Sequence, residues 1–350
     1  MTDQHRSGQN RTGQHRSGQN GSGQHQAVLG AEITALPPER RPTPGPIAVL
    51  PKPTEIFTSA VRDAGGQVAE LSAETRGVVW LSYRRADELS ATLEANPQIE
   101  WVQLPWAGVD AFGDVLASQA RPRLLWTSAK GAYAQPVAEH ALALTLALLR
   151  VLHERARAAS WDSVPAGRSL YGRNIVIIGA GGIALELIRL LAPFDAAITV
   201  VRRSATPVPG AVRTVQMGQL HQVLPMADVV VVAAALTADS RHLLGAPEFD
   251  LMSSHANLVN IARGALVDTD ALVAALAAGD IAGAALDVTD PEPLPDGHPL
   301  WSERRCLITP HMADTPEMTV PLLAERIRLN VRAFLDDGRF VGVVDPQSGY

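Results

Sequence analysis

The sequence predicts an α/β protein with two parallel-sheet domains that face each other across a hinged cleft. Two observations lead to this fold class. A strongly apolar strand runs directly into a glycine-rich turn and a helix at residues 174–184, and further apolar strand segments alternate with helical patterns before and after it. The chain of 350 residues, 46% of them hydrophobic and 19% charged, is long enough for two domains of ordinary size.

The first 45 residues are predicted to be a disordered low-complexity tail and linker. The sequence QHRSGQN at residues 4–10 recurs at residues 14–20, and Gly23-Gln24-His25 begins a third copy. The repeat offers no apolar side chain to bury, so it cannot offset the entropy lost on ordering. Its histidines, His5, His15 and His25, make weak metal binding conceivable, but a mobile tail or a misassigned start site is the preferred interpretation.

The first domain is predicted to comprise residues 46–135 together with residues 316–350. Short apolar segments predict strands at residues 47–50, 78–81 and 101–104. A long apolar helix at about residues 136–152 would lead into the second domain, residues 136–315. An amphipathic helix at about residues 316–336 would return the chain to the first domain, and these two crossings would form the cleft.

The second domain begins with a predicted strand–turn–helix unit that suits a dinucleotide. Gly179 makes the tight turn, Gly181 lets the backbone approach a pyrophosphate, and Ala184 is small enough for helix and strand to pack. The N–H groups of the helix N-terminus would face a phosphate. The predicted contacts of this turn are Gly179, Gly181, Gly182 and Ile183. Later strands are predicted at residues 198–201, 229–232, 256–260, 284–287 and 307–308.

The residues after the strand at 198–201 indicate which nicotinamide cofactor binds. An acid there would hydrogen-bond the ribose 2′-hydroxyl of NAD and repel a 2′-phosphate. The chain has Arg202, Arg203 and Ser204 instead, and their guanidinium and hydroxyl groups suit a 2′-phosphate. We predict that NADP(H) is preferred and NAD(H) is possible; a solvated loop is the alternative interpretation of the two arginines.

Charge and cysteine content exclude several classes of protein. A net charge of −6 argues against nucleic acid or an anionic membrane as the main partner. No apolar run approaches the roughly 18 residues of a spanning helix. Cys306 is the single cysteine and cannot form an internal disulfide, and no metal-type spacing surrounds it. A cytoplasmic protein without a bound metal is expected.

Three polar segments follow predicted strands of the second domain, where ligands bind in open α/β sheets. They are residues 260–268 (NIARGALVD), 285–293 (ALDVTDPEP) and 309–311 (TPH). With these motifs the chain resembles the D-isomer-specific 2-hydroxyacid dehydrogenases, which include glyoxylate/hydroxypyruvate reductases, phosphoglycerate dehydrogenases and formate dehydrogenases. The resemblance covers residues 46–345, and residues 101–110 and 137–142 also match family segments. It implies a flavodoxin-like substrate domain, a Rossmann-like dinucleotide-binding domain and a homodimer.

The resemblance implies a role for each residue of a catalytic set. Arg263 would anchor the substrate carboxylate and carbonyl, Glu292 would orient and charge His311, and His311 would exchange a proton with the substrate oxygen. These roles fit the chemistry, because negative charge grows on the carbonyl oxygen as hydride reaches carbon. Glu292 is preferred to the nearby Asp290 because of its spacing from Asp287.

Other expected contacts surround this set. Backbone N–H groups would hold the substrate carboxylate at Ala107, Gly108 and Val109. Asp287 resembles the residue that contacts the nicotinamide amide. The remaining predicted cofactor contacts are Ala235, Thr237 and Ile261, of which Ala235 stands where the family usually has proline. His140 is expected to pack and hydrogen-bond in the bridging helix, and Trp106 either shapes the side-chain pocket or only packs.

The favoured function is NADPH-preferring reduction of a small 2-ketoacid, such as glyoxylate or hydroxypyruvate, to the D-2-hydroxyacid. A phosphoglycerate dehydrogenase-type enzyme is the enzymatic alternative; it is weakened because the chain ends soon after the last predicted helix. A dinucleotide-sensing binding protein is the alternative from another class. Turnover with a panel of ketoacids would separate these hypotheses.

Overall fold

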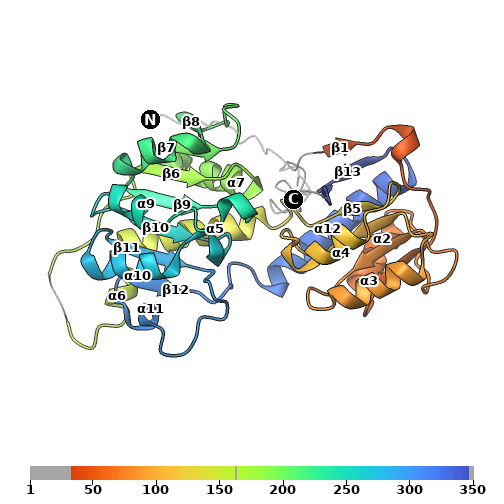
Figure 1. Ribbon diagram of the computed structural model, residues 1–350, viewed down its shortest axis with the longest axis horizontal. Coiled ribbons are helices and arrows are strands. Elements are labelled where there is room, and N and C mark those ends of the chain that lie inside the picture. Colours follow the sequence, from red (N-terminus) through yellow and green to blue (C-terminus); the bar gives the residue numbers. More distant parts are fainter. Residues whose placement is uncertain (1–32, 162–163, 347–350) are drawn as a thin grey trace, which may run out of the picture.

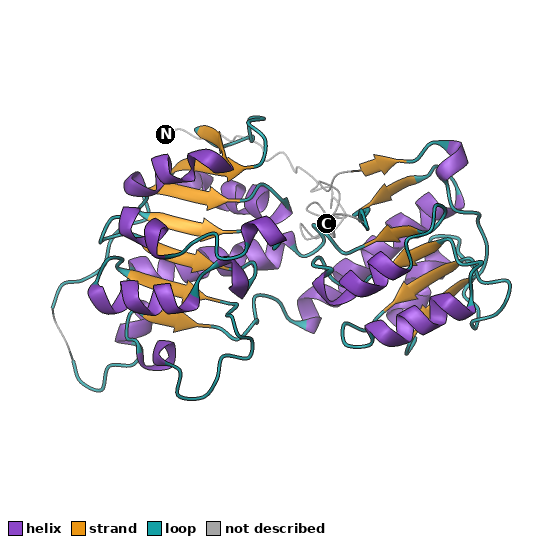
Figure 2. Ribbon diagram, in the orientation of Figure 1, coloured by secondary structure: helices purple, strands orange, loops and turns teal. Residues whose placement is uncertain are grey.

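The computed structural model describes residues 33–161 and 164–346. The described residues form two lobes, each built on a parallel sheet with helices against it (Figures 1 and 2). The repeats predicted to form a tail lie outside the described residues. None of the helices in the described ranges combines the length and apolar composition needed to cross a bilayer.

The elements alternate between strands and helices along most of the chain. The strands are β1 (Ile33–Ala35), β2 (Ile47–Leu50), β3 (Gly77–Trp80), β4 (Trp101–Gln103), β5 (Leu125–Thr127), β6 (Asn174–Ile178), β7 (Ala197–Arg202), β8 (Arg213–Gln216), β9 (Val229–Val232), β10 (Asn257–Asn260), β11 (Gly283–Leu286), β12 (Cys306–Ile308) and β13 (Arg339–Val341). The α-helices are α2 (Glu55–Asp63), α3 (Ala86–Ala95), α4 (Gly113–Ser118), α5 (Ala134–Leu149), α6 (Leu152–Arg155), α7 (Gly182–Leu191), α8 (Leu220–Val223), α9 (Ala246–Leu251), α10 (Thr269–Ala278), α11 (Pro299–Ser302) and α12 (Pro316–Leu335).

The smaller sheet has the strand order β2-β3-β4-β5, and all its strands are parallel. On the far side of β2, Val68 pairs in parallel with Ile47. If this short pairing is counted as a strand, the order becomes the 2-1-3-4-5 of the flavodoxin-like folds. The predicted flavodoxin-like domain is thereby confirmed in its topology.

Both faces of the smaller sheet are covered. Val78 and Trp80 pack on one face with the apolar residues of α3 and α4. Ile47 and Val79 pack on the other face with α2 and with α12, which returns from the far end of the chain. Figure 1 shows α12 in blue among the orange helices of this lobe. The predicted return crossing at residues 316–336 is confirmed by α12.

The larger sheet is parallel throughout and has the order β12-β11-β10-β9-β6-β7-β8. The chain builds outward from β6 in one direction through β7 and β8, and then returns to add β9 on the other side of β6. This reversal creates a switch point between β6 and β9, where the loops leave the sheet in opposite directions. Ligands of doubly wound sheets bind at such a point, beyond the carboxyl ends of the strands.

Residues of β6 alternate between two apolar cores. Ile175 and Ile177 pack with α5 and α7, whereas Val176 and Ile178 pack with residues of α8, α9 and α10. All four are nearly inaccessible to solvent. This burial on both faces explains why the strands were predicted from continuous apolar runs rather than from alternation.

The predicted linker is wrong for part of its length. Ile33–Ala35 forms β1, which pairs antiparallel with β13, and a 3-10 helix follows at Pro38–Arg40. The strand was missed because it is three residues long and its partner lies about 300 positions away in the sequence, beyond the reach of a local pattern. The domain bounds themselves stay a prediction.

Candidate active site

The turn after β6 requires glycine. Gly179 has φ +113°, and a Cβ there would overlap the Ala233 carbonyl at the end of β9. The turn therefore lies directly against the next strand's loop, at the switch point of the sheet. A glycine permits both the positive φ and the close approach.

The same turn opens α7 with its backbone donors free of side-chain caps. Gly181 is the N-cap and supplies no side chain, and Gly182 begins the helix. An added Cβ at Gly182 would lie 3.2 Å from the Gly131 Cα and 3.3 Å from the Ala134 Cβ, so the turn packs closely on the start of α5. Ala184 is fully buried against the sheet. Uncapped N–H groups at a helix N-terminus suit the pyrophosphate of a dinucleotide.

The arginines predicted to select the cofactor lie where β7 ends. Arg202 is the last residue of β7 and is partly exposed, and Arg203 follows it and is exposed. Neither guanidinium makes a hydrogen bond or ion pair within residues 33–161 and 164–346. The Ser204 hydroxyl donates weakly to Thr206 Oγ1 over 3.3 Å. Both guanidinium groups are available to an anion.

The other predicted cofactor contacts border the turn from β9 and β10. The Ser240 hydroxyl donates to the Ala235 carbonyl over 3.0 Å, and the Thr237 N–H donates to Ser240 Oγ over 2.8 Å. Ile261 is buried immediately after β10. Because β9 and β10 are the strands next to β6 on one side, these residues lie on the same edge of the sheet as Gly179.

Asn260 shapes the turn that carries Arg263. Its buried side-chain amide donates to the Arg263 carbonyl over 2.9 Å, and its oxygen accepts from the Ala262 N–H over 3.1 Å. A Cβ on Gly264 would overlap the backbone of Thr289. The glycine therefore lets the loop after β11 cross the loop after β10, and this crossing brings the second and third predicted motifs together.

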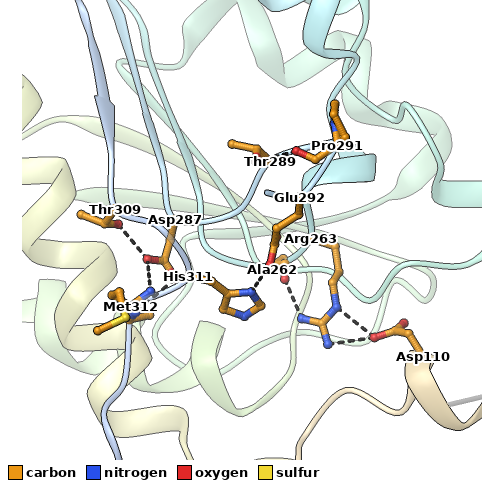
Figure 3. Close-up of polar contacts among 11 residues, drawn as sticks. Asp110, Ala262, Arg263, Asp287, Thr289, Pro291, Glu292, Thr309, His311 and Met312 are labelled. Atoms are coloured by element: carbon orange, nitrogen blue, oxygen red, sulfur yellow. Dashed lines mark hydrogen bonds and ion pairs between the residues drawn. The ribbon is translucent and has the colours of Figure 1, made fainter. Parts of the chain in front are cut away.

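Arg263 reaches across to the other lobe. Its Nε and Nη2 each lie 2.9 Å from Asp110 Oδ2, and its Nη1 donates to the Ala262 carbonyl over 2.7 Å (Figure 3). A Cβ on Gly108 would overlap the guanidinium. The predicted carboxylate-binding residues Ala107, Gly108 and Val109 thus lie against Arg263.

His311 pairs with Glu292 as predicted. The imidazole Nδ1 lies 2.6 Å from Glu292 Oε1, and both side chains are about half exposed. The neighbouring acid, Asp290, is engaged elsewhere: its Oδ2 lies 3.0 Å from Arg241 Nη2. In Figure 3 the imidazole and the Arg263 guanidinium point to the same side of these loops. The geometry supports Glu292 rather than Asp290 as the partner of His311.

Asp287, which was predicted to contact the nicotinamide amide, accepts hydrogen bonds from protein groups near His311. Its carboxylate is almost fully buried and accepts hydrogen bonds from the Thr309 hydroxyl (2.7 Å), the Met312 N–H (2.9 Å) and the Ala313 N–H (3.2 Å). Burial by itself would raise the pKa of Asp287, but the hydrogen bonds from His140, Thr309 and Met312 outweigh burial and hold the pKa below its usual value. Asp287 therefore anchors the loop that carries His311; its contact with a cofactor stays a prediction.

His140 connects α5 to this anchor. Its Nε2 lies 2.9 Å from Thr309 Oγ1 and 3.4 Å from Asp287 Oδ1. Because the single Thr309 hydroxyl hydrogen is donated to the carboxylate, His140 Nε2 must carry the hydrogen of its own bond to Thr309. The expectation that His140 packs and hydrogen-bonds is confirmed.

Aromatic side chains flank the loop of Ala107–Val109. Trp106 is 38% exposed as a residue, and its ring makes edge contacts with Tyr83, at 6.2 Å between ring centroids, and Tyr133, at 5.7 Å. The buried Tyr133 hydroxyl donates to the Pro105 carbonyl over 2.6 Å. Trp106 thus both packs and presents a ring to solvent beside the predicted carboxylate site.

Sequence reasoning missed the roles of Asp110, Asn260 and Thr309. Each stands inside or beside a motif that was identified, but its partner could not be inferred from spacing. Asp110 directly follows the predicted carboxylate-binding loop. An acid at that position is the one local signal that could have indicated a partner for Arg263.

Comparisons with known proteins agree with this geometry. The family model for the NAD-binding domain of D-isomer-specific 2-hydroxyacid dehydrogenases matches residues 141–313. The chain is 38% identical over 257 residues to an uncharacterised protein of Corynebacterium melassecola, covering 72% of this chain and 84% of the relative. It is 30% identical to a glyoxylate reductase of Thermococcus gammatolerans, covering 81% and 83% of the two chains.

A solved structure extends the similarity to both lobes. A D-isomer-specific 2-hydroxyacid dehydrogenase from Xanthobacter autotrophicus, crystallised with NADPH and MES, superposes with a TM-score of 0.75 at 26% identity, covering 88% of this chain and all of that one. The uncapped turn after β6 fits the nicotinamide dinucleotide that such enzymes use. The strand topology, the motif-bearing loops and these relatives together establish that the chain belongs to the D-isomer-specific 2-hydroxyacid dehydrogenase family of NAD(P)-dependent oxidoreductases.

Proposed function

We propose that the enzyme reduces a small 2-ketoacid to the D-2-hydroxyacid and prefers NADPH as the reductant. The observation that carries this proposal is that a histidine–glutamate pair and a guanidinium lie on loops at the carboxyl ends of the neighbouring parallel strands β10, β11 and β12, on the same edge of the sheet as the dinucleotide turn, and point to the same side of these loops (Figure 3). Relatives named glyoxylate reductase and glyoxylate/hydroxypyruvate reductase support a substrate of this size.

The protein's part in the reaction is proton transfer and charge stabilisation. Glu292 holds His311 at Nδ1, so Nε2 is the atom left to give a proton to the substrate oxygen. A bound reduced nicotinamide supplies the hydride to the carbonyl carbon. Arg263 stabilises the negative charge that grows on the oxygen, and the backbone at Ala107–Val109 holds the carboxylate. In the reverse direction His311 accepts the proton.

The NADPH preference rests on Arg202 and Arg203 at the end of β7, whose guanidinium groups have no partner among the residues that the structure describes. A 2′-phosphate that gains one or two charge-assisted bonds at a partly exposed site is favoured by roughly 1.5 to 3 kcal/mol, or about 10- to 100-fold. Similar structures crystallised with NADPH or NADP support the proposal.

Cofactor choice is tested with kcat/KM for NADPH and NADH at fixed ionic strength. Arg202→Asp should reverse the preference, because it removes an attraction and adds a repulsion. Arg203→Ala should only weaken the preference. Arg213→Ala is the matched control, since Arg213 is exposed on the neighbouring strand β8. A wild-type enzyme that favours NADH would establish that Arg202 and Arg203 are only solvated.

The substrate is tested by following NADPH oxidation with glyoxylate, hydroxypyruvate, pyruvate and 3-phosphohydroxypyruvate. We expect the highest kcat/KM with glyoxylate or hydroxypyruvate, and chiral chromatography should identify D-glycerate as the product from hydroxypyruvate. Preference for the phosphorylated ketoacid would favour the phosphoglycerate dehydrogenase alternative. Cofactor binding without turnover on any ketoacid would favour a sensor.

We also propose a homodimer in the cytoplasm. The segment after α5 exposes large apolar side chains, and a second copy could cover them; they are Leu152, Trp161 and Tyr171. The single cysteine, Cys306, is buried and has no second cysteine to pair with, which fits a reducing compartment. Light scattering of the purified chain tests the dimer, and fractionation of the cells that express it tests the compartment.

A further inference from the structure

Asp110 engages one particular edge of the Arg263 guanidinium. A guanidinium carries five N–H donors in a rigid planar fork. Asp110 Oδ2 takes one from Nε and one from Nη2, and the Ala262 carbonyl takes one from Nη1. The two donors that remain are on Nη1 and Nη2, at the terminal edge of the fork. That edge can bind the carboxylate or carbonyl of a ketoacid with two parallel hydrogen bonds.

The position of Asp110 is fixed by the core of the smaller lobe. It begins a 3-10 helix, Asp110–Phe112, in which the Phe112 N–H donates to the Val109 carbonyl over 2.8 Å. Val109 and Phe112 are both buried. Gly108 lies so close beneath the guanidinium that it has no room for a Cβ. The carboxylate therefore stands on a rigid base, directly beside the loop that would hold the substrate.

The pair joins two lobes rather than two neighbouring loops. Asp110 follows β4 of the smaller sheet, and Arg263 follows β10 of the larger sheet, 153 positions later. Both side chains are partly exposed, at 42% and 31%. An ion pair with this exposure contributes little to folding stability. The contact forms only where the lobes meet, and its effect is to fix the orientation of the Arg263 guanidinium.

We propose that Asp110 is a positioning residue: it holds Arg263 by the Nε–Nη2 edge when the lobes meet and presents the terminal edge to the ketoacid. This inference rests on the proposed function, because it assigns the free donors to that substrate. The proposal also separates the effect of the orientation of Arg263 from the effect of the net charge at the site. Asp110 reduces the net positive charge at the site, so its removal would strengthen substrate binding if charge alone mattered.

The test compares Asp110→Ala and Asp110→Asn with Asp114→Ala in the holoenzyme with hydroxypyruvate. Asp114 is an exposed acid four residues away on α4, so its removal makes the same change in net charge. We expect Asp110→Ala to lower kcat about 10- to 100-fold, the scale of a misplaced catalytic group, with KM for NADPH unchanged. Asp110→Asn should recover part of the loss, because its amide oxygen still accepts, and Asp114→Ala should match wild type.

A double-mutant cycle establishes whether Asp110 acts through Arg263. In an Arg263→Ala background, Asp110→Ala should cause no further loss. Additive losses, or equal behaviour of Asp110→Ala and Asp114→Ala, would overturn the inference. So would a lower KM for the ketoacid with kcat retained, because Asp110 would then be an obstacle in the carboxylate site.

Oxalate binding separates this inference from the proposed function. Calorimetry with NADPH-loaded protein needs no turnover, and oxalate offers the same carboxylate chemistry as glyoxylate. We expect Asp110→Ala to weaken oxalate binding about 10-fold and to have no effect in the Arg263→Ala background. If wild type reduces no ketoacid but shows this pattern, the positioning role holds and the proposed function fails. If oxalate binds wild type and Asp110→Ala equally, the positioning role fails.

Discussion

Two histidine–glutamate pairs in this chain have the same length and different surroundings. His311 Nδ1 lies 2.6 Å from Glu292 Oε1, and His221 Nε2 lies 2.6 Å from Glu248 Oε1. Both histidine side chains are more than half exposed. A carboxylate can orient an imidazole in either place, so the pair by itself does not identify a site.

The surroundings account for the difference. Glu248 also accepts the Gly245 N–H over 2.9 Å, so its second oxygen closes the first turn of α9. His311 instead lies in a loop, at φ +52°, with its N–H bonded to the Asp287 carbonyl over 2.6 Å. That loop lies on the same edge of the sheet as the loop of Arg263 and the dinucleotide turn. A histidine–glutamate pair becomes a candidate proton donor only where a group that binds the substrate and a group that binds the cofactor converge on it.

The sharpest test of this comparison exchanges each histidine for asparagine. His311→Asn should lower kcat about 100-fold or more, the usual scale for loss of a general acid, with cofactor affinity nearly intact. Asparagine tolerates the positive φ at this position, so the loop should keep its conformation. His221→Asn is the matched control and should leave kcat unchanged. Steady-state kinetics with hydroxypyruvate and NADPH titration measure both; near-normal turnover of His311→Asn would remove the distinction between the pairs.

A smaller loss of kcat is expected when the hydrogen bonds that anchor the His311 loop to Asp287 are changed. Thr309→Val removes the hydroxyl that joins His140 to Asp287, and leaves a half-buried donor and a buried carboxylate each without one partner. We expect kcat to fall about 10-fold through misplacement of the His311 loop, and Tm to fall with the roughly 1 to 3 kcal/mol cost of an unpaired buried group.

Thr319→Val is the control for this substitution. Within the described part of the chain, the Thr319 hydroxyl donates only to the carbonyl of Thr315, the N-cap of α12, over 3.1 Å. Its loss should leave kcat unchanged. If both valine variants lost activity equally, the Thr309 hydroxyl would have no special part in holding His311.

The comparison also shows what could be predicted from the sequence. The glycine turn and the segments around Arg263, Glu292 and His311 were predictable because each follows a buried strand of a parallel sheet, and the carboxyl ends of such strands share one edge. The family resemblance, together with the spacing from Asp287, favoured Glu292 over Asp290 as the partner of His311. Strand pattern therefore predicted which edge of the sheet carries the site, and the resemblance predicted which residues meet there.

What could not be predicted depends on contacts between distant segments. The pairing of Asp110 with Arg263 needs two lobes to approach, and β1 needs β13 from the other end of the chain. Strand β8, Arg213–Gln216, is a short edge strand with one buried residue and carries too little apolar pattern to detect. The hydrogen bonds to the buried Asp287 carboxylate depend on the geometry of the loop after β12, which the spacing of residues in the sequence does not specify.

The smallest expected effect concerns the pair that lies outside the site. Glu248→Ala removes the acceptor for the Gly245 N–H at the start of α9, and loss of such a cap costs about 0.5 to 1 kcal/mol. Tm should therefore fall slightly, while kcat stays at the wild-type value. Glu292→Ala should show the opposite pattern, because a half-exposed pair adds little stability but orients His311. Thermal unfolding and kcat of both variants complete the comparison, and a loss of turnover in Glu248→Ala would show that the two pairs are not functionally distinct.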